Sequence, residues 1–210
     1  MYYLITNEND TTWRDVVWGP EVSHEVNEPN YFFEVYEHIP TALFMQHAYE
    51  DIQNPKVWEC SIENPVKRGV ATLASKVTTH KCITPLEITD DQRITFAMLC
   101  SLQVVLNPIF RDWAFGYLNG SDTDKNKAIQ VQEQLMLQIG DENIPEAHDY
   151  ISCAHACLAT VFAEDIRHYA AYAAHRAYYD SPEQDRIDIP KLSEIAVTVP
   201  REQIAEILAF

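Results

Sequence analysis

The pattern of apolar residues changes near residue 88, and this change constrains the fold more than any other feature of the chain. Before it, short segments rich in aromatic and β-branched residues alternate with Asn, Asp, Gly and Pro, which is typical of strands and turns. One helix is expected among them, since Pro40 suits a first helical position and TALFMQHAYEDI carries apolar residues at helical spacing. The expected strands lie in YYLIT (2–6), TWRDVVW (12–18), YFFEVY (31–36), KVWECSI (56–62) and GVATLASKVTTHKCI (69–83).

Downstream of residue 88 the sequence predicts helices only. A capping box, in which Thr89 caps the helix and Gln92 reaches back, precedes the run RITFAMLCSLQVVL. Asn107 and the proline after it restart a helix, and Gly120 is placed to end it. Further helices are expected from Ser121 or Asp122 to Gly140, from Asn143 or Pro145 without interruption to Pro182, and after Pro200.

These patterns predict an α+β protein. A small β-rich layer with one helix is expected over residues 1–87, followed by an antiparallel bundle of about five helices over residues 88–210. The two parts are expected to form two domains or one continuous fold.

The segment CAHACLATVFAEDIRHYAAYAAH (153–175) concentrates side chains that can bind metals. On one continuous helix, at about 100° per residue, a single stripe collects the candidate ligand or metal site, which consists of Cys157, Glu164, His168 and His175. The spacing of the two cysteines differs from the C-x₂-C of structural zinc sites, and Glu-x-x-x-His differs from the Glu-x-x-His of di-iron bundles. A polar seam between helices that pack closely through their alanines explains the same residues. We therefore expect no catalytic residue and no cofactor here, and a ligand site remains the alternative.

Other catalytic motifs are not visible in the chain. It has no G-x-S-x-G elbow, phosphate loop or dinucleotide fingerprint, and five glycines leave little room for any of them. Cys82 and His80 would share one face of a strand, but the sequence identifies no third group that orients the histidine. Six aromatic residues are expected mainly in the core, with an exposed partner-binding patch as the lesser alternative; they are Trp13, Trp18, Tyr31, Phe32, Phe33 and Tyr36.

The chain is strongly acidic, with thirty-two acidic and fifteen basic residues and a net charge of −17. The excess is spread along the chain, because residues 1–87 carry six basic and thirteen acidic residues and residues 88–210 carry nine and nineteen. Binding to phosphate backbones relies on clustered Lys and Arg, so direct binding to DNA or RNA is disfavoured. An acidic surface suits a basic protein partner, and it also serves solubility alone.

The sequence favours a cytoplasmic protein with reduced cysteines and no membrane partner. No apolar run approaches the roughly 20 residues of a membrane span. The N-terminal MYYLITNEND lacks the features of a secretory signal, and five cysteines are an odd number.

Several stretches resemble known families. CSLQVVLNPIF, DWAFGYLNGSDTDKNKAI and YISCAHACLATVFAEDIRHYAAYAAHRAYYD resemble the Ala-rich, all-helical immunity proteins of bacterial polymorphic toxin systems. NPKVWECSI and PLEITDDQRITFAMLC are similar to segments of uncharacterised phage and cyanobacterial proteins that join such helices to a small N-terminal domain. The middle segment KNKAIQVQEQLMLQIG departs from this pattern because it is polar and poor in alanine. The resemblance implies a protein that neutralises a toxin or effector, with no catalytic residues to carry over.

Charge and resemblance together predict an acidic, non-enzymatic protein-binding inhibitor of immunity or phage counter-defence type, in the cytoplasm of a bacterium or a phage-infected host cell. Its partner would be a basic protein, such as a nuclease whose substrate groove it occupies. Two alternatives stay open. One is an enzyme or a small-ligand or metal-binding protein with a site between the α+β layer and the bundle, which would use His80, Glu164, His168 or His175. The other is a structural or virion-associated protein.

Overall fold

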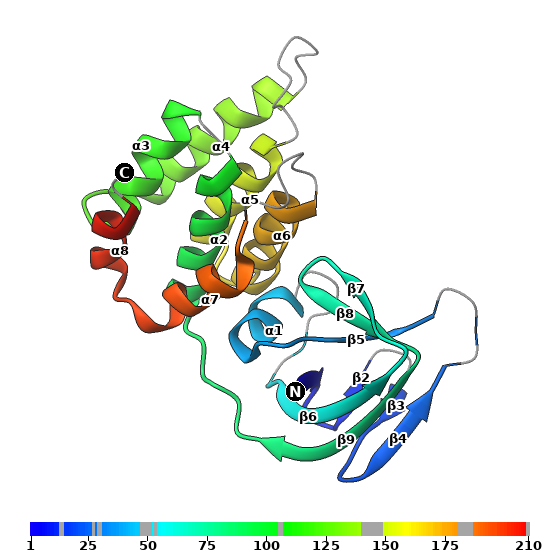
Figure 1. Ribbon diagram of the computed structural model, residues 1–210. Helices are drawn as coiled ribbons and strands as arrows, with labels where there is room; N and C mark the ends of the chain where they lie inside the picture. The colour runs from blue at the N-terminus through cyan, green and yellow to red at the C-terminus, as the bar shows by residue number, and fades with distance from the viewer. Residues whose placement is uncertain are drawn as a thin grey trace. The chain divides into compact units, whose positions relative to one another are not determined.

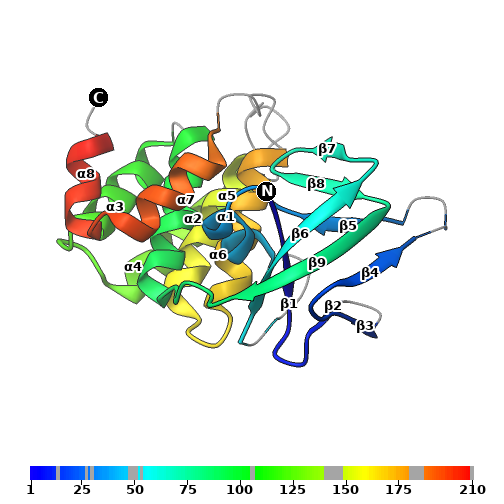
Figure 2. The same ribbon diagram turned by 60° about the horizontal axis from the view of Figure 1, so that its bottom comes forward.

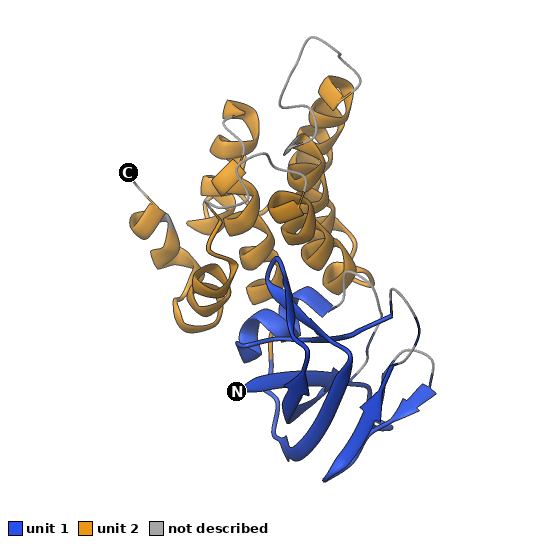
Figure 3. Ribbon diagram, turned by 45° about the vertical axis from the view of Figure 1, so that its right-hand side comes forward, with its two compact units in different colours: residues 1–87 blue, residues 88–210 orange. Residues whose placement is uncertain are grey.

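The computed structural model describes residues 1–210 apart from 13, 14, 27, 29, 30, 47–51, 53, 105, 106, 140–148, 180–186, 209 and 210. Contacts within the chain divide it into two compact units, residues 1–87 and residues 88–210 (Figures 1 and 3). Among the described residues, the first unit holds the strands and one helix, and the second unit is helical, so the protein belongs to the α+β class.

The strands that the structure describes in the first unit form three antiparallel sheets. Their orders are β1-β6-β9-β4, β5-β8-β7 and β2-β3. The two longest strands, β6 and β9, lie side by side in the four-stranded sheet (Figure 2). The bounds are β1 Tyr2–Thr6, β2 Thr11–Thr12, β3 Val16–Val17, β4 Val22–Glu25, β5 Phe33–Val35, β6 Lys56–Glu63, β7 Val66–Arg68, β8 Ala71–Ala74 and β9 Lys76–Ile83.

Strands were predicted best where the sequence is rich in aromatic and β-branched residues. The expected strands at 2–6 and 56–62 are confirmed, and the segment 69–83 forms two strands. The expected strand at 12–18 is wrong in its middle, because Asp15 has a left-handed φ of 57° and separates β2 from β3. The short polar strands β4 and β7 were not predicted, since VSHE and VKR lack the apolar alternation of a half-buried strand.

The core of the first unit is built around Trp18. Its indole nitrogen donates to the Thr12 hydroxyl at 3.0 Å, and its ring packs edge-on against Phe33 and His24, with centroids 5.2 and 4.8 Å away. The other buried members of this cluster are Leu4, Val35, Trp58, Cys60, Ala74 and Val77.

The expectation for the aromatic residues is confirmed where the structure describes them as buried, at Trp18, Phe33 and Tyr36. Phe32 is 37% exposed, and Trp13 lies outside the described residues. The helix expected at Pro40 is also confirmed, because α1 (Ile39–Met45) has this proline in its first turn and buries Thr41 to Met45. The end of that expected helix, 47–51, lies outside the described residues.

The described part of the second unit contains seven helices. They are α2 Asp90–Val104, α3 Pro108–Leu118, α4 Lys125–Ile139, α5 Asp149–Val161, α6 Ile166–Tyr179, α7 Ile189–Thr198 and α8 Arg201–Leu208. Helix α7 was not predicted. None of the described helices combines the length and the apolar character needed to cross a membrane.

Local sequence signals place the ends of several of these helices. The capping box is confirmed, since the Thr89 amide donates to Gln92 Oε1 at 2.9 Å and the Gln92 amide donates to the Thr89 hydroxyl at 3.2 Å. Asn107 caps α3 by accepting from two backbone amides. Gly120, with a φ of 78°, follows the end of α3 as expected. Helix α4 begins later than expected, because Asp124 is its cap and accepts from the Asn126 amide at 2.9 Å.

The uninterrupted helix expected between residues 145 and 182 is wrong. Helix α5 ends at Val161, a turn follows in which the Asp165 amide donates to the Phe162 carbonyl, and α6 begins at Ile166. The carbonyl of Asp165 accepts the first intrahelical bond of α6, from Tyr169. Acidic side chains at 164 and 165 favour a helix N-terminus here, because they complement the positive end of its dipole. The two helices pack against each other as a hairpin.

Helix α2, and not the segment 153–175, is buried on all sides. Every residue from Arg93 to Ser101 is buried, and α2 contacts α5, α6 and α7. A buried hydrogen-bond chain joins three helices, since Ser101 donates to Ser152 of α5 at 2.6 Å and Ser152 donates to the Ala173 carbonyl of α6 at 2.8 Å. The close packing rests on small residues, as expected; those buried on α5 and α6 are Ala154, Ala156, Ala159, Ala170, Ala171, Ala173, Ala174 and Ala177.

Candidate functional site

The structure separates the four residues that the sequence placed on one stripe. Cys157 is buried on α5, and burial raises the pKa of its thiol well above the ordinary value, so the sulfur stays protonated. Glu164 is exposed in the turn between α5 and α6, His168 is exposed on α6, and His175 is half-buried on α6. Among the described residues, no three or more His, Cys, Asp or Glu side chains are grouped so that they could hold a metal ion.

A row of aromatic and imidazole rings lies along the α5–α6 hairpin, with Tyr172 at its centre. The Tyr172 ring lies 4.7 Å from His155, 5.7 Å from His168 and 6.2 Å from His175 between centroids. Arg176 donates to the Tyr172 hydroxyl at 3.0 Å, and its guanidinium lies over the Tyr172 ring. These rings pack against one another, so the row contributes to the packing of α5 against α6.

Burial lowers the pKa of His155 and outweighs the hydrogen bond to the Ile151 carbonyl, which raises it, while Arg176 and His168 nearby lower it further. Its Nδ1 lies 2.7 Å from the Ile151 carbonyl, so this nitrogen is the donor of the hydrogen bond. His155 is therefore held as a neutral imidazole.

Helix α4 presents apolar side chains to solvent. Its inner side buries Ala128, Val131 and Leu135. On the outer side Ile129 is 37% exposed, Met136 50% and Leu137 81%. We call Ile129, Glu133, Met136 and Leu137 the α4 stripe, because at about 100° per residue all four lie within an arc of roughly 100°.

The neighbouring helix α3 also carries one exposed apolar residue. The side-chain Nδ2 of Asn107 donates to Gln138 Oε1 at 2.8 Å, which places the first turn of α3 beside the last turn of α4. Ile109, in that turn of α3, is 39% exposed.

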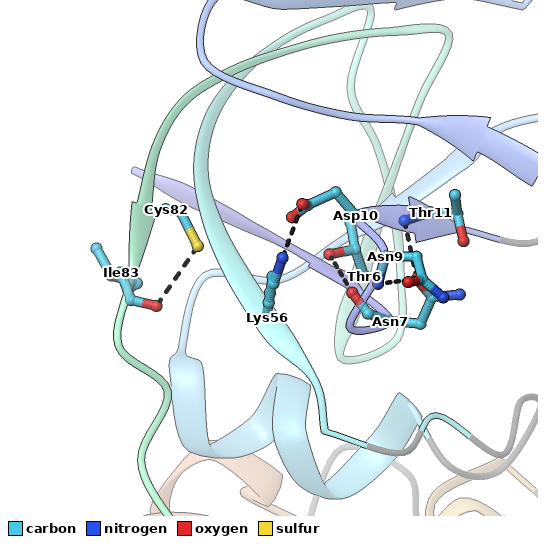
Figure 4. A network of polar contacts seen from close by, with 8 residues as sticks. All are labelled: Thr6, Asn7, Asn9, Asp10, Thr11, Lys56, Cys82 and Ile83. Carbon is cyan, nitrogen blue, oxygen red and sulfur yellow. Dashed lines mark hydrogen bonds and ion pairs between the residues drawn. The ribbon is translucent and has the colours of Figure 1, made fainter.

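In the first unit, a polar network surrounds the turn between β1 and β2 (Figure 4). Asn7 Oδ1 accepts from the amides of Asn9 and Thr11, and Asp10 Oδ2 pairs with Lys56 Nζ at 2.7 Å. Cys82, the exposed cysteine, lies near this ion pair. Partial burial and the Asp10 carboxylate raise the pKa of Cys82 more than Lys56 lowers it, so the thiol is not activated as a nucleophile.

A second polar arrangement lies on the four-stranded sheet. His80 Nε2 is 3.0 Å from Ser61 Oγ, and His80 Nδ1 is 3.3 Å from Glu21 Oε1. The sequence singled out His80 but paired it with Cys82, and it identified no orienting group. That group, Glu21, is 59 residues away, and only the pairing of β4 with β9 brings it close.

The α4 stripe was also missed at the level of sequence. Its signal is a second set of apolar residues at spacings of seven and eight, on the side of the helix opposite the set 128, 131 and 135. The segment was noted only as polar.

Comparison with known proteins found no match among protein-family models, curated proteins or solved structures.

Proposed function

We propose that the protein binds a basic protein partner and blocks the surface that the partner needs. It would act as an immunity or counter-defence protein in the cytoplasm of a bacterium or a phage-infected host cell. In this proposal, residues 88–210 form an antiparallel helical bundle whose docking face is the α4 stripe. The exposure of Ile129, Met136 and Leu137 is the observation that carries the proposal.

The apolar residues of the α4 stripe contribute little to the fold. Helix α4 attaches to the rest of its unit through its inner side, whereas the side chain of Leu137 is almost fully in water. Adjacent apolar side chains on a surface helix are typical of protein-binding sites, where a few desolvated anchors supply most of the binding energy. The stripe therefore suits a partner with an apolar depression.

The charge of the protein supports a basic partner. Glu133 lies within the stripe, and its carboxylate is exposed among the three apolar residues. The chain as a whole carries a net charge of −17. An apolar centre with acidic surroundings attracts a surface rich in Lys and Arg over long range and then excludes water on contact.

The test uses tagged protein to capture partners from bacterial lysate, followed by calorimetry with each purified partner. The double substitution Met136→Ser with Leu137→Ser should weaken binding by on the order of 100-fold, since each residue is an anchor. Val66→Ser is the matched control, because Val66 is 53% exposed on β7 of the other unit. Equal binding by the double variant and the control would refute the α4 docking face.

Salt gives a second readout of the same complex. Binding should weaken by about tenfold or more between low and high ionic strength, because the attraction between exposed charges is screened. A captured partner that is not basic, or a dissociation constant that does not change with salt, would contradict the electrostatic part of the proposal.

A further inference from the structure

Three side chains on the four-stranded sheet form a chain of contacts. A serine hydroxyl contacts an imidazole, and the imidazole contacts a carboxylate. Ser61 is on β6, His80 is on β9, and Glu21 is in the turn that precedes β4. Ser61 Oγ lies 3.0 Å from His80 Nε2, and Glu21 Oε1 lies 3.3 Å from His80 Nδ1. All three side chains are exposed.

A bulge in the pairing of β6 with β9 places the side chain of His80 beside Ser61. Glu59 of β6 pairs with Lys81, and the next residue, Cys60, pairs with Thr79, so His80 is an extra residue on β9. Such a bulge turns the side chain of its extra residue relative to the regular strand, and bulges are frequent beside active sites. Ser61 follows at once on the partner strand, which explains the contact.

A buried hydroxyl positions the carboxylate. Thr79, which has no exposed surface, donates to the Gly19 carbonyl at 2.6 Å and lies 3.2 Å from the Val22 carbonyl. These bonds fix both ends of the turn 19–22 on β9. Glu21 has a left-handed φ of 58° within that turn, and its side chain reaches His80, the residue after Thr79.

The hydrogen-bond partners determine which nitrogen carries the proton. A carboxylate only accepts, so the Nδ1–H of His80 donates to Glu21. In the neutral imidazole this leaves the lone pair of Nε2 for the hydroxyl proton of Ser61, which is the arrangement that activates a serine. Lys81 pairs across the strands with Glu59, two residues before Ser61, so it emerges on the same face.

We propose that Ser61 is a nucleophile activated by His80 and Glu21, and that it takes acyl groups from small activated esters. Ser61 Oγ forms a bond to the acyl carbon while its proton moves to His80 Nε2. The bond from the acyl carbon to the leaving oxygen breaks, and His80 returns the proton to that oxygen. Water, deprotonated by the same nitrogen, then attacks the acyl carbon, the bond from that carbon to Ser61 Oγ breaks, and His80 returns the proton to Ser61 Oγ. This site goes beyond the proposed partner binding and shares no residue with the α4 stripe.

The chain contains a matched control for this serine. Ser23 on β4 is exposed and pairs with Thr78, the same residue of β9 that pairs with Ser61 from the other side. The Ser23 hydroxyl accepts from Thr78 Oγ1 at 3.0 Å, so its neighbour is a hydroxyl and not an imidazole.

The experiment treats the full chain with an alkyl fluorophosphonate and measures the rate of labelling at each serine by peptide mass spectrometry. In this reaction Ser61 Oγ bonds to phosphorus, fluoride leaves, and the proton passes to His80 and then to water. Ser61 should react on the order of 100-fold faster than Ser23, which is the lower range of general-base catalysis.

Two substitutions test whether Ser61 reacts fast because His80 and Glu21 activate it or only because it is exposed. His80→Gln should reduce the rate at Ser61 to that at Ser23, and Glu21→Gln should reduce it about tenfold because the imidazole loses its orienting partner. Both variants should keep the labelling rate at Ser23 and the circular dichroism of the native protein. Equal rates at Ser61 and Ser23 in the native protein, or a Ser61 rate that His80→Gln does not change, would overturn the proposal. Labelling requires no partner, so its failure says nothing about the α4 stripe.

Discussion

Helices α2 and α4 have the same length, fifteen residues, but opposite surroundings. Helix α2 buries nine consecutive residues, from Arg93 to Ser101, and touches helices on every side. Helix α4 buries three residues and leaves Ile129, Met136 and Leu137 exposed by 37%, 50% and 81%. The apolar residues of α2 therefore hold the unit together, whereas those on the outer side of α4 are exposed, as the proposed docking face requires.

The largest expected difference between the two helices is the loss of unfolding free energy when a leucine is replaced by alanine. Leu99 of α2 is fully buried, and Leu137 of α4 is 81% exposed. Leu99→Ala should lower the free energy of unfolding by about 2–5 kcal/mol, because it removes buried methyl groups and leaves a cavity. Leu137→Ala should change it by no more than about 0.5 kcal/mol. Urea denaturation measures both, and equal losses would remove the distinction between the helices.

The buried hydrogen-bond chain gives the next largest effect. Ser152→Ala should destabilise the protein by about 1–3 kcal/mol, because the Ser101 hydroxyl and the Ala173 carbonyl then lose their shared partner in the interior. Ser121, an exposed serine before α4, is the control, and Ser121→Ala should be nearly neutral. Urea denaturation again provides the measurement. A neutral Ser152→Ala would mean that the interior of this unit is more open to water than the burial of α2 implies.

The caps of the two helices should differ less. Thr89→Ala removes half of the capping box of α2, and Asp124→Ala removes the cap of α4. Each should cost about 1 kcal/mol of unfolding free energy, since caps act on local backbone amides and not on packing. Circular dichroism should show a loss of helical signal, from fraying of the uncapped helix end, in proportion to the loss of unfolding free energy. A loss several times larger at Thr89 would indicate that packing of α2, and not capping, is being measured.

The smallest effect is a dependence on pH at the α5–α6 hairpin. The pKa of His155 is lowered in the folded state by burial and by Arg176 and His168. The unfolded chain therefore binds the proton more readily, so stability is present above the unfolded pKa, about 6.5, and is lost as pH falls below it. His155→Gln should reduce the difference in unfolding free energy between pH 7.5 and pH 5. A variant with the same pH dependence as the native protein would assign that loss to other groups.

Local chemistry explains which parts of this fold could be predicted. Thr89, Asn107 and Gly120 mark helix ends through bonds or backbone angles within a few residues, and all three were found from the sequence. The break at 162–165 contains neither Gly nor Pro, and only the acidic pair Glu164 and Asp165 indicated a new helix N-terminus. The predicted stripe of candidate ligands assumed one continuous helix. The break at 162–165 therefore makes that prediction wrong as well.

The contacts of His80 could not be predicted for a different reason. They depend on a bulge in β9 and on the pairing of β9 with β4, a strand of four residues without a strong sequence signal. Register between strands is set by turns and by the whole sheet, so a side chain 59 residues away cannot be assigned from the segment alone. The outer stripe of α4 was within reach of the sequence, since its spacing is helical, but exposure is a property of the folded unit.

The most direct measurement is a calorimetric titration of the purified partner with the native protein and with the variant that combines Glu133→Lys and Leu137→Asp. Both substitutions lie in the α4 stripe and face water. We predict a dissociation constant weaker by on the order of 100-fold or more, with an unfolding free energy within about 0.5 kcal/mol of the native value. An unchanged dissociation constant would contradict the assignment of α4 as the surface that binds a basic protein.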